Sequence, residues 1–174
     1  KKGMAYITES RRDNGFFPNF SIAQNMAISR SLKDGGYKGA MGLFHEVDEQ
    51  RTAENQRELL ALKCHSVNQN ITELSGGNQQ KVLISKWLCC CPEVIIFDEP
   101  TRGIDVGAKA EIYKVMRQLA DDGKVILMVS SELPEIITVC DRIAVFCEGR
   151  LTQILTNRDD MSEEEIMAWA LPQE

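Results

Sequence analysis

The sequence predicts an α/β protein with a parallel sheet and a mostly helical stretch between its first two strands. Three observations predict this class. Apolar runs at residues 3–8, 94–97 and 124–130 have the length of strands. Residues 47–64 and 108–122 carry apolar side chains at helical spacing. Strands that alternate with helices in this way are typical of parallel sheets.

Local signals mark the elements of the first half. The first strand ends at Glu9, and Ser21 is placed to cap a short helix that runs to about Arg30. Residues 33–44 contain Asp-Gly-Gly, which predicts a loop. The run at 94–97 is continuous in β-branched and aromatic residues, so we expect a strand covered on both faces.

The second half continues the alternation. Gly123 stands at the C′ position of the helix at 108–122, where glycine ends helices. We expect a second buried strand at 124–130, followed by a short helix at 134–140.

The last part of the chain carries a hairpin signal and a helix start. Glu148-Gly149 lies between the strand-like runs 142–147 and 150–155. Ser162 and Glu165 have the spacing of a capping box for a helix that ends near Leu171.

Composition limits the class of protein. The 174 residues are 43% hydrophobic and 26% charged, as in a globular protein of about one domain. The formal net charge of −6 argues against a nucleic-acid partner, which would favour a basic face. No apolar run is long enough to cross a membrane. The six cysteines lack CxxC spacing and predict reduced thiols that pack as small apolar residues.

The strand at 94–97 ends in two carboxylates, Asp98 and Glu99. Adjacent acids after an apolar strand are costly unless a cation or a proton donor meets them. In a phosphoryl-transfer site, one such acid holds Mg²⁺ and the next orients the attacking water. The alternative is that both acids cap turns at a sheet edge, and this pattern alone leaves both interpretations open.

A glycine-rich segment, LSGGNQQ at residues 74–80, precedes that strand. Ser75 can serve as the N-cap of a helix, and Gly76 and Gly77 leave the backbone N–H groups of its first turn accessible. Such N–H groups bind phosphate oxygens. Alone, the segment fits a plain helix cap, but its pairing with the strand that ends in Asp98 predicts a nucleotide site.

LSGGNQQK followed by VIIFDEPTRGIDVGAK resembles the ABC-transporter ATPases. The first motif is similar to their signature. The second is similar to their Walker B strand with its catalytic glutamate, followed by the D-loop at residues 103–105. The resemblance covers nearly the whole chain. Within this family, the motifs are most similar to those in the C-terminal ATPase half of two-domain monosaccharide importers of the ribose, arabinose, xylose and allose type. Among these importers, the sequence most resembles the D-allose importers of enteric bacteria.

The resemblance implies a P-loop NTPase-like ABC domain with a parallel sheet core and a helical signature subdomain, truncated at its N-terminus. The motif GxxxxGK[ST] (Walker A) is not in the sequence, and we expect it upstream of Lys1, so that this chain alone is inactive. The expected divisions are the Q-loop strand at 1–10, the helical subdomain with the signature at 11–91, the α/β core with Walker B, D-loop and switch region at 92–156, and a C-terminal helix at 157–174.

The same resemblance implies ATP and Mg²⁺ as cofactors and assigns roles to nine residues. Asp98 and Glu99 are the expected catalytic residues, and Asp98 and Glu9 are the expected metal ligands. The expected nucleotide contacts are Ser75, Gly76, Gly77, Gln79, Glu9, Asp105 and Ser131.

Two of these residues depart from the family pattern. Glu9 stands where many relatives have the glutamine that senses the nucleotide. Ser131 stands where a histidine usually follows the strand, and a serine hydroxyl is shorter and cannot carry charge at pH 7. Whether the site that contains Asp98 and Glu99, called the local site below, hydrolyses ATP is therefore left open.

The leading hypothesis is an ATP-binding segment that couples ATP binding and hydrolysis to monosaccharide uptake. The alternative is a non-hydrolysing half that supplies the signature to a competent site elsewhere. A third possibility, an ABC protein acting on ribosomes or chromosomes, is disfavoured by the acidic charge.

The expected partners follow from the leading hypothesis. They are the N-terminal ABC domain of the same protein or a second copy, transmembrane permease subunits and, indirectly, a periplasmic sugar-binding protein. The aromatic loop at 16–20 either receives the permease or fills the helical core. The expected location is peripheral, on the cytoplasmic face of the bacterial inner membrane. The sugar stays open because the permease and binding protein select it, and so does the oligomeric state.

Overall fold

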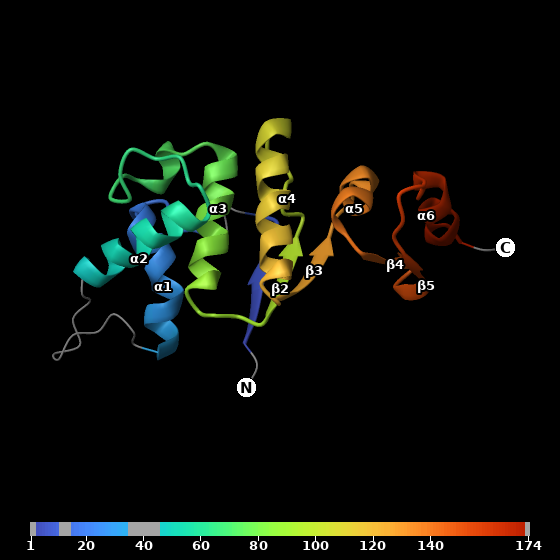
Figure 1. Cartoon of the computed structure of the whole chain (residues 1–174), viewed down its shortest axis with the longest axis horizontal. Coiled ribbons are helices and arrows are strands. Elements are labelled where there is room, and N and C mark those ends of the chain that lie inside the picture. Colours follow the sequence, from blue (N-terminus) through green and yellow to red (C-terminus); the bar gives the residue numbers. More distant parts are fainter. Residues whose placement is uncertain (1–2, 11–14, 35–45, 173–174) are drawn as a thin grey trace. The chain divides into compact units, whose positions relative to one another are not determined.

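A computed structural model describes residues 3–10, 15–34 and 46–172 (Figure 1). Contacts within the chain divide it into a first unit, residues 1–129, and a second unit, residues 130–174. Each unit is described by itself. The predicted loop at 33–44 lies mostly outside the described residues. In the described part, no helix is long and apolar enough to span a bilayer.

The first unit contains the predicted parallel sheet, and its strands lie in the order β1–β2–β3. The register aligns Met4 with Val94 and Val94 with Val125. The strands are β1 (Met4–Ile7), β2 (Val94–Asp98) and β3 (Val125–Val129). The parallel α/β class is therefore confirmed.

Only one face of this sheet is well covered, because alternate side chains of a strand point to opposite faces. The covered face, which α3 and α4 contact, buries Ala5, Ile7, Ile95 and Phe97 to 1% exposure or less. On the other face Val125, Leu127 and Val129 are 60%, 53% and 49% exposed, and Met4 and Tyr6 are also exposed. The predictions of a strand covered on both faces at 94–97 and of a buried strand at 124–130 are thus wrong for the described residues, since their helices pack on one face.

The helical part of the first unit lies between β1 and β2. Ser21 begins α1 as predicted: its hydroxyl accepts from the Gln24 N–H at 3.2 Å, and the Gln24 amide accepts from the Ser21 N–H at 2.9 Å. The elements are α1 (Ile22–Asp34), α2 (Glu46–Leu59), the 3-10 helix η2 (Ile71–Glu73) and α3 (Gly76–Leu88). Their shared core consists of Phe16, Ile22, Ala23, Met26, Ala53, Leu62, Val67, Ile71, Leu74, Val82 and Leu83.

Helix α2 ends five residues earlier than the sequence predicts. The cause is Ala61, whose φ of 46° is left-handed. The Leu62 N–H donates to the Arg57 carbonyl at 2.9 Å and closes the helix end. A left-handed alanine is uncommon, so the sequence does not announce this stop.

Helix α4 (Val106–Asp121) connects β2 to β3. Gly123 ends it with a φ of +83°, as its predicted C′ position requires. The Lys124 N–H then bonds the Leu119 carbonyl at 3.0 Å, and the chain enters β3.

The second unit consists of α5 (Leu133–Val139), the hairpin β4 (Arg142–Cys147) and β5 (Arg150–Thr156), and α6 (Glu163–Ala170). The predicted hairpin is confirmed. Its two turn residues have positive φ, 49° at Glu148 and 77° at Gly149, which suits the twist of the strands. The core of the second unit consists of Ile143, Val145, Met161 and Ile166.

The predicted capping box of α6 forms only in part. The Ser162 hydroxyl accepts from the Glu165 N–H at 3.3 Å, but the Glu165 carboxylate pairs with Arg158 instead of returning to Ser162. The predicted domain limits stay a prediction, since the division observed here is the one after Val129.

Candidate functional site

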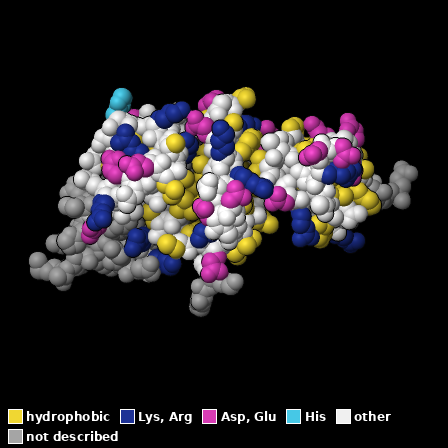
Figure 2. All heavy atoms as spheres, in the orientation of Figure 1, with side chains coloured by type: hydrophobic (Ala, Val, Ile, Leu, Met, Phe, Trp, Pro, Cys, Tyr) yellow, Lys and Arg dark blue, Asp and Glu magenta, His cyan; other side chains and the backbone are white. Residues whose placement is uncertain are grey.

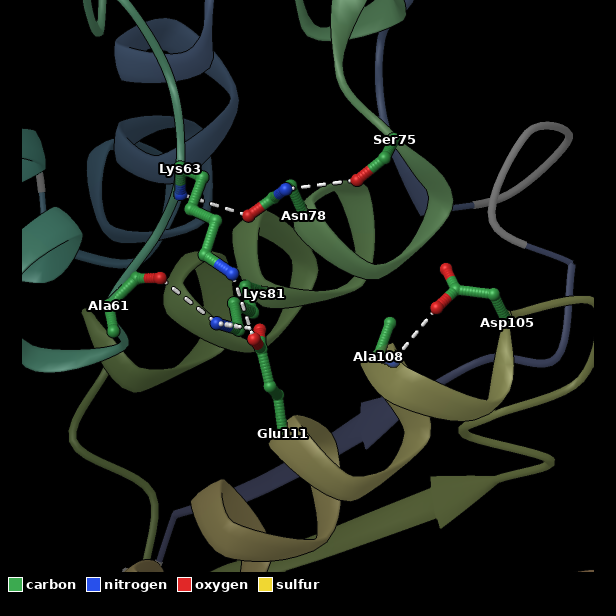
Figure 3. A network of polar contacts seen from close by, with 8 residues as sticks. All are labelled: Ala61, Lys63, Ser75, Asn78, Lys81, Asp105, Ala108 and Glu111. Atoms are coloured by element: carbon green, nitrogen blue, oxygen red, sulfur yellow. Dashed lines mark hydrogen bonds and ion pairs between the residues drawn. The ribbon is translucent and has the colours of Figure 1, made fainter.

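Helix α3 begins at Gly76, as the glycine-rich segment predicts, with exposed Ser75 at its N-cap position. The Ser75 hydroxyl does not bond the backbone of the first turn, contrary to the expected cap. It accepts a hydrogen bond of 2.9 Å from the Asn78 side-chain amide instead (Figure 3).

Gly77 lies where α3 contacts α4. A Cβ added to Gly77 would lie 2.6 Å from the Ala108 Cβ, closer than real side-chain carbons approach. Gly77 is buried there. Helix packing therefore requires a glycine at this position, independently of any contact with a nucleotide.

Gln79 turns inward from the start of α3. Its side chain is 7% exposed, and its amide donates to the Leu74 carbonyl at 3.1 Å and to the Ile71 carbonyl at 3.4 Å. These bonds brace the segment that leads into α3. The expected contact of Gln79 with the nucleotide stays a prediction.

A buried lysine joins α3 to α4 one turn after Gly77. The Lys81 ammonium donates to the Glu111 carboxylate at 2.9 Å and to the Ala61 carbonyl at 3.0 Å. Lys63 also donates to Glu111, at 3.0 Å (Figure 3). Hydrogen bonds from these two cations hold the pKa of Glu111 at about 2.

The two predicted catalytic carboxylates lie at the carboxyl end of β2. The Tyr6 hydroxyl, on the neighbouring strand, donates to Asp98 Oδ2 at 2.5 Å, and this bond raises the pKa of Tyr6. Glu99 has a left-handed φ of 47°, and its N–H donates to the Val129 carbonyl at 2.9 Å. A left-handed glutamate is strained, and such strain is concentrated at functional sites.

Glu9 and Asp105, the other predicted residues of the first unit, already have partners. The Arg102 guanidinium forms an ion pair with the Glu9 carboxylate. Asp105 is the N-cap of α4, and its carboxylate accepts from the Ala108 N–H at 2.9 Å. Their expected contacts with nucleotide and metal stay predictions.

Comparison with known proteins decides the family. Residues 1–102 match the family model described as ABC transporter. The chain belongs to the ABC transporter family. Membership implies nucleotide binding, and the assignments of residues 74–80 as the signature and of the end of β2 as Walker B stay predictions.

Curated relatives narrow the resemblance. The chain is 47% identical to the L-arabinose transport ATP-binding protein AraG of Geobacillus stearothermophilus, over 95% of this chain and 31% of that protein. It is 45% identical to the ribose import ATP-binding protein RbsA of Bacillus cereus, over 98% of this chain and 33% of that protein. The chain thus spans about a third of the length of these relatives.

Solved structures confirm the fold. A dimeric ATP-binding cassette in a post-hydrolysis state, bound to ADP and Pi, matches with a TM-score of 0.72 and 22% identity, over 90% of this chain and 64% of that one. A metal-chelate type ABC transporter in an inward-facing conformation matches with a TM-score of 0.77 and 16% identity, over 97% of this chain and 64% of that one. The ABC cassette fold is therefore shown.

Ser131, the predicted switch-position residue of this ABC chain, belongs to the second unit. It lies exposed in the turn before α5. Its neighbour Ser130 donates to the buried Glu135 carboxylate at 2.6 Å and accepts from the Glu132 N–H at 3.1 Å. These bonds order the turn that carries Ser131, whose contact with a nucleotide stays a prediction.

The Walker B end of the sheet suits Mg²⁺ bound together with phosphates. Among the described residues, no three His, Cys, Asp or Glu side chains form a cluster that could hold a metal. Magnesium commonly uses one or two protein carboxylates and takes its other ligands from phosphate and water. Asp98, which accepts a hydrogen bond from the Tyr6 phenol, fits that role better than Glu9, which is paired with the Arg102 guanidinium.

The aromatic loop of the helical part places one ring in the core and leaves another exposed, and its contact with a permease stays a prediction. Phe16 is 7% exposed and packs in the helical core. Phe17 is 45% exposed, stacks on Phe20 with ring centroids 5.1 Å apart, and has the Lys86 ammonium 5.6 Å from its ring. Phe17 therefore offers an aromatic surface.

The network around the signature contains four residues whose side chains the sequence did not single out: Lys63, Asn78, Lys81 and Glu111. A signal was present for Lys81, which follows Gly77 by four residues and so lies on the same helix face. Only the packing of α3 against α4 shows that Glu111 meets this face.

Proposed function

We propose that this chain is the ATP-binding segment of a monosaccharide ABC importer, coupling ATP binding and hydrolysis to sugar uptake. The carrying observation is its 47% identity, over 95% of the chain, to an L-arabinose transport ATP-binding protein. The geometry supports the proposal, because Ser75 is exposed at the start of a helix whose first N–H groups suit phosphate oxygens.

In this function Ser75, Gly76 and Gly77 face an ATP held by another ABC domain, either in the same protein or in a second copy. When bound, Mg²⁺ would neutralise charge on the phosphates, and Asp98 would hold it. Glu99 orients the attacking water at the local site. Gln79 and Asp105 hold the signature segment and the start of α4 in place for nucleotide binding. Glu9 would contribute to the metal site, and Ser131 would be a nucleotide contact that belongs to the second unit.

The second candidate is a half that supplies the signature without hydrolysing its own ATP. Two observations favour it: Ser131 occupies the histidine position, and Glu9 is paired with Arg102. The local site would then lack both a histidine and a free Q-loop side chain.

Substitutions in the full-length product of the gene, assembled with its permease, separate the two candidates. Ser75→Ala should lower sugar-stimulated ATP turnover under both. Glu99→Gln should lower it about 100-fold or more if the local site hydrolyses, and less than twofold if it does not. Gly77→Asp is a poor test, because any side chain at Gly77 also meets Ala108.

The proposed partners are permease subunits, which Phe17 is exposed to contact, and a periplasmic sugar-binding protein that acts through them. The proposed location is peripheral, at the cytoplasmic face of the bacterial inner membrane. Among the described residues, Lys and Arg side chains are intermingled with Asp and Glu side chains on the face drawn in Figure 2. Co-purification of the full-length product with a membrane permease tests this assignment.

The identity of the transported sugar is the most specific part of the proposal. The relatives are named for L-arabinose and ribose, and the motifs resemble those of D-allose importers. Uptake of labelled D-allose, ribose and L-arabinose by cells with and without the gene would identify the sugar. If deletion of the gene leaves the uptake of all three sugars, and of xylose, unchanged, a monosaccharide importer of this type is refuted.

A further inference from the structure

The Asn78 side chain accepts one hydrogen bond and donates another, so its amide has a defined orientation. Its carbonyl oxygen accepts from the Lys63 backbone N–H at 2.9 Å. Its amide nitrogen donates to the Ser75 hydroxyl oxygen at 2.9 Å (Figure 3). Because a backbone N–H can only donate, the first bond determines which end of the amide faces Ser75.

The segment that carries Lys63 is itself anchored. The buried Lys81 ammonium donates to the Ala61 carbonyl at 3.0 Å, two residues before Lys63. The Lys63 and Lys81 ammonium groups both bond Glu111, at 3.0 and 2.9 Å. The N–H that orients Asn78 is therefore held by contacts from α3 and α4.

The direction of these bonds determines the polarity of the Ser75 hydroxyl. A serine hydroxyl has one proton and two lone pairs. The Asn78 amide occupies a lone pair, so the proton is left to donate elsewhere. Ser75 is exposed, and its donor can therefore point toward a ligand outside the chain.

We propose that Asn78 is a positioning residue that keeps the Ser75 hydroxyl as a hydrogen-bond donor toward a phosphate oxygen of the nucleotide. The inference rests on the proposed function, in which Ser75 faces an ATP held by another ABC domain. It adds an orienting role for the residue that follows the two glycines of the signature.

Asn78→Asp tests the proposal, because aspartate has the shape of asparagine with the opposite polarity. One carboxylate oxygen still accepts from the Lys63 N–H, but the other accepts the Ser75 proton and turns the hydroxyl lone pairs toward the phosphate. Asn78→Ala instead removes the bond and leaves the hydroxyl free to rotate. In the full-length product, we expect kcat/KM for ATP to fall about 100-fold in Asn78→Asp and about fivefold in Asn78→Ala.

The same two substitutions in the Ser75→Ala background measure the effects of Asn78 on kcat/KM that do not depend on the Ser75 hydroxyl. There, Asn78→Asp should cost at most tenfold, from its charge alone, and Asn78→Ala less than twofold. Thermal melting of each variant reports changes in stability. If the role of Asn78 were purely structural, its substitution would lower the melting temperature and the activity equally in both backgrounds.

Equal losses in the two backgrounds would overturn the role of Asn78 while leaving the proposed function intact. A Ser75→Ala variant with unchanged ATP turnover would overturn both the role of Asn78 and the proposed contact of the Ser75 hydroxyl with ATP. A much larger loss for Asn78→Asp with Ser75 present is the result that supports the inference.

Discussion

The Lys81 ammonium lies 2.9 Å from the Glu111 carboxylate, one turn beyond the point where Gly77 meets Ala108. Both contacts advance along α3 and α4 together, so the two helices run in the same direction with their starts side by side. The signature thus begins next to the helix that Asp105 caps.

The pair is asymmetric in burial, and this predicts an asymmetric response to substitution. The Lys81 side chain is 3% exposed, whereas that of Glu111 is 40% exposed. Glu111→Ala leaves a buried ammonium without its carboxylate and should lower the free energy of unfolding by about 3 kcal/mol. Lys81→Met fills the same space and leaves Glu111 with Lys63 and water, so it should cost less than about 1 kcal/mol. Urea unfolding of the full-length product measures both, and a larger loss for Lys81→Met would contradict this account.

Acid should weaken the contact between the two helices. The pKa of Glu111 is about 2 in the folded protein against an ordinary value of 4.5, so its ionised form is stabilised by folding. This contribution is complete above about pH 4.5 and is lost as the pH falls toward 2. The stability difference between the native protein and Glu111→Gln should therefore shrink between pH 4.5 and 2. A difference that stays constant over that range would show that the carboxylate charge plays no part.

The contact between Gly77 and Ala108 can be tested by exchanging the methyl group. Gly77→Ala should destabilise the protein by about 1–3 kcal/mol through overpacking. Adding Ala108→Gly removes the methyl group that is in the way and should restore most of the loss, since the helix propensities of the two changes nearly cancel. Thermal melting of the single and double variants checks this, and strictly additive losses would rule out the contact.

The hydroxyl of Tyr6 should influence the use of Mg²⁺ through Asp98. Tyr6→Phe removes the bond that orients this carboxylate, and loss of such a supporting bond commonly weakens metal binding about tenfold or more. The Mg²⁺ concentration for half-maximal ATP turnover should rise about tenfold in the full-length product. Tyr113→Phe, on α4, is the matched control and should leave it unchanged. An equal shift in both variants would assign the effect to general loosening.

The adjacent cysteines should differ in reactivity. All six cysteines are free, and Cys89 is buried while Cys91 is exposed. Burial raises the pKa of Cys89 to about 11, which leaves little thiolate at pH 8. Alkylation at pH 8, followed by tandem mass spectrometry, should label Cys91 about 100-fold faster than Cys89, and urea should abolish the difference. The Cys91→Ser variant should lack the fast phase.

The sequence alone was sufficient for the parallel sheet, the start of α3, the end of α4 and the hairpin. Each of these depends on local signals, such as the glycines at 76 and 123 and the Glu148-Gly149 turn. It was insufficient for the end of α2, where Ala61 adopts a left-handed conformation without a glycine. It also misjudged β3, because apolar composition reports a preference for burial and not whether a covering element is present.

The motifs by themselves determined the family and the two places where nucleotide chemistry is expected, because each motif is a continuous stretch of the sequence. The tertiary structure decided how those motifs are held. It paired Asn78 with Ser75 and Lys63, Lys81 with Glu111, and Tyr6 with Asp98. Apart from the bond between Asn78 and Ser75, these contacts join residues distant in sequence. They depend on distances and hydrogen-bond directions that only the packed helices and paired strands define.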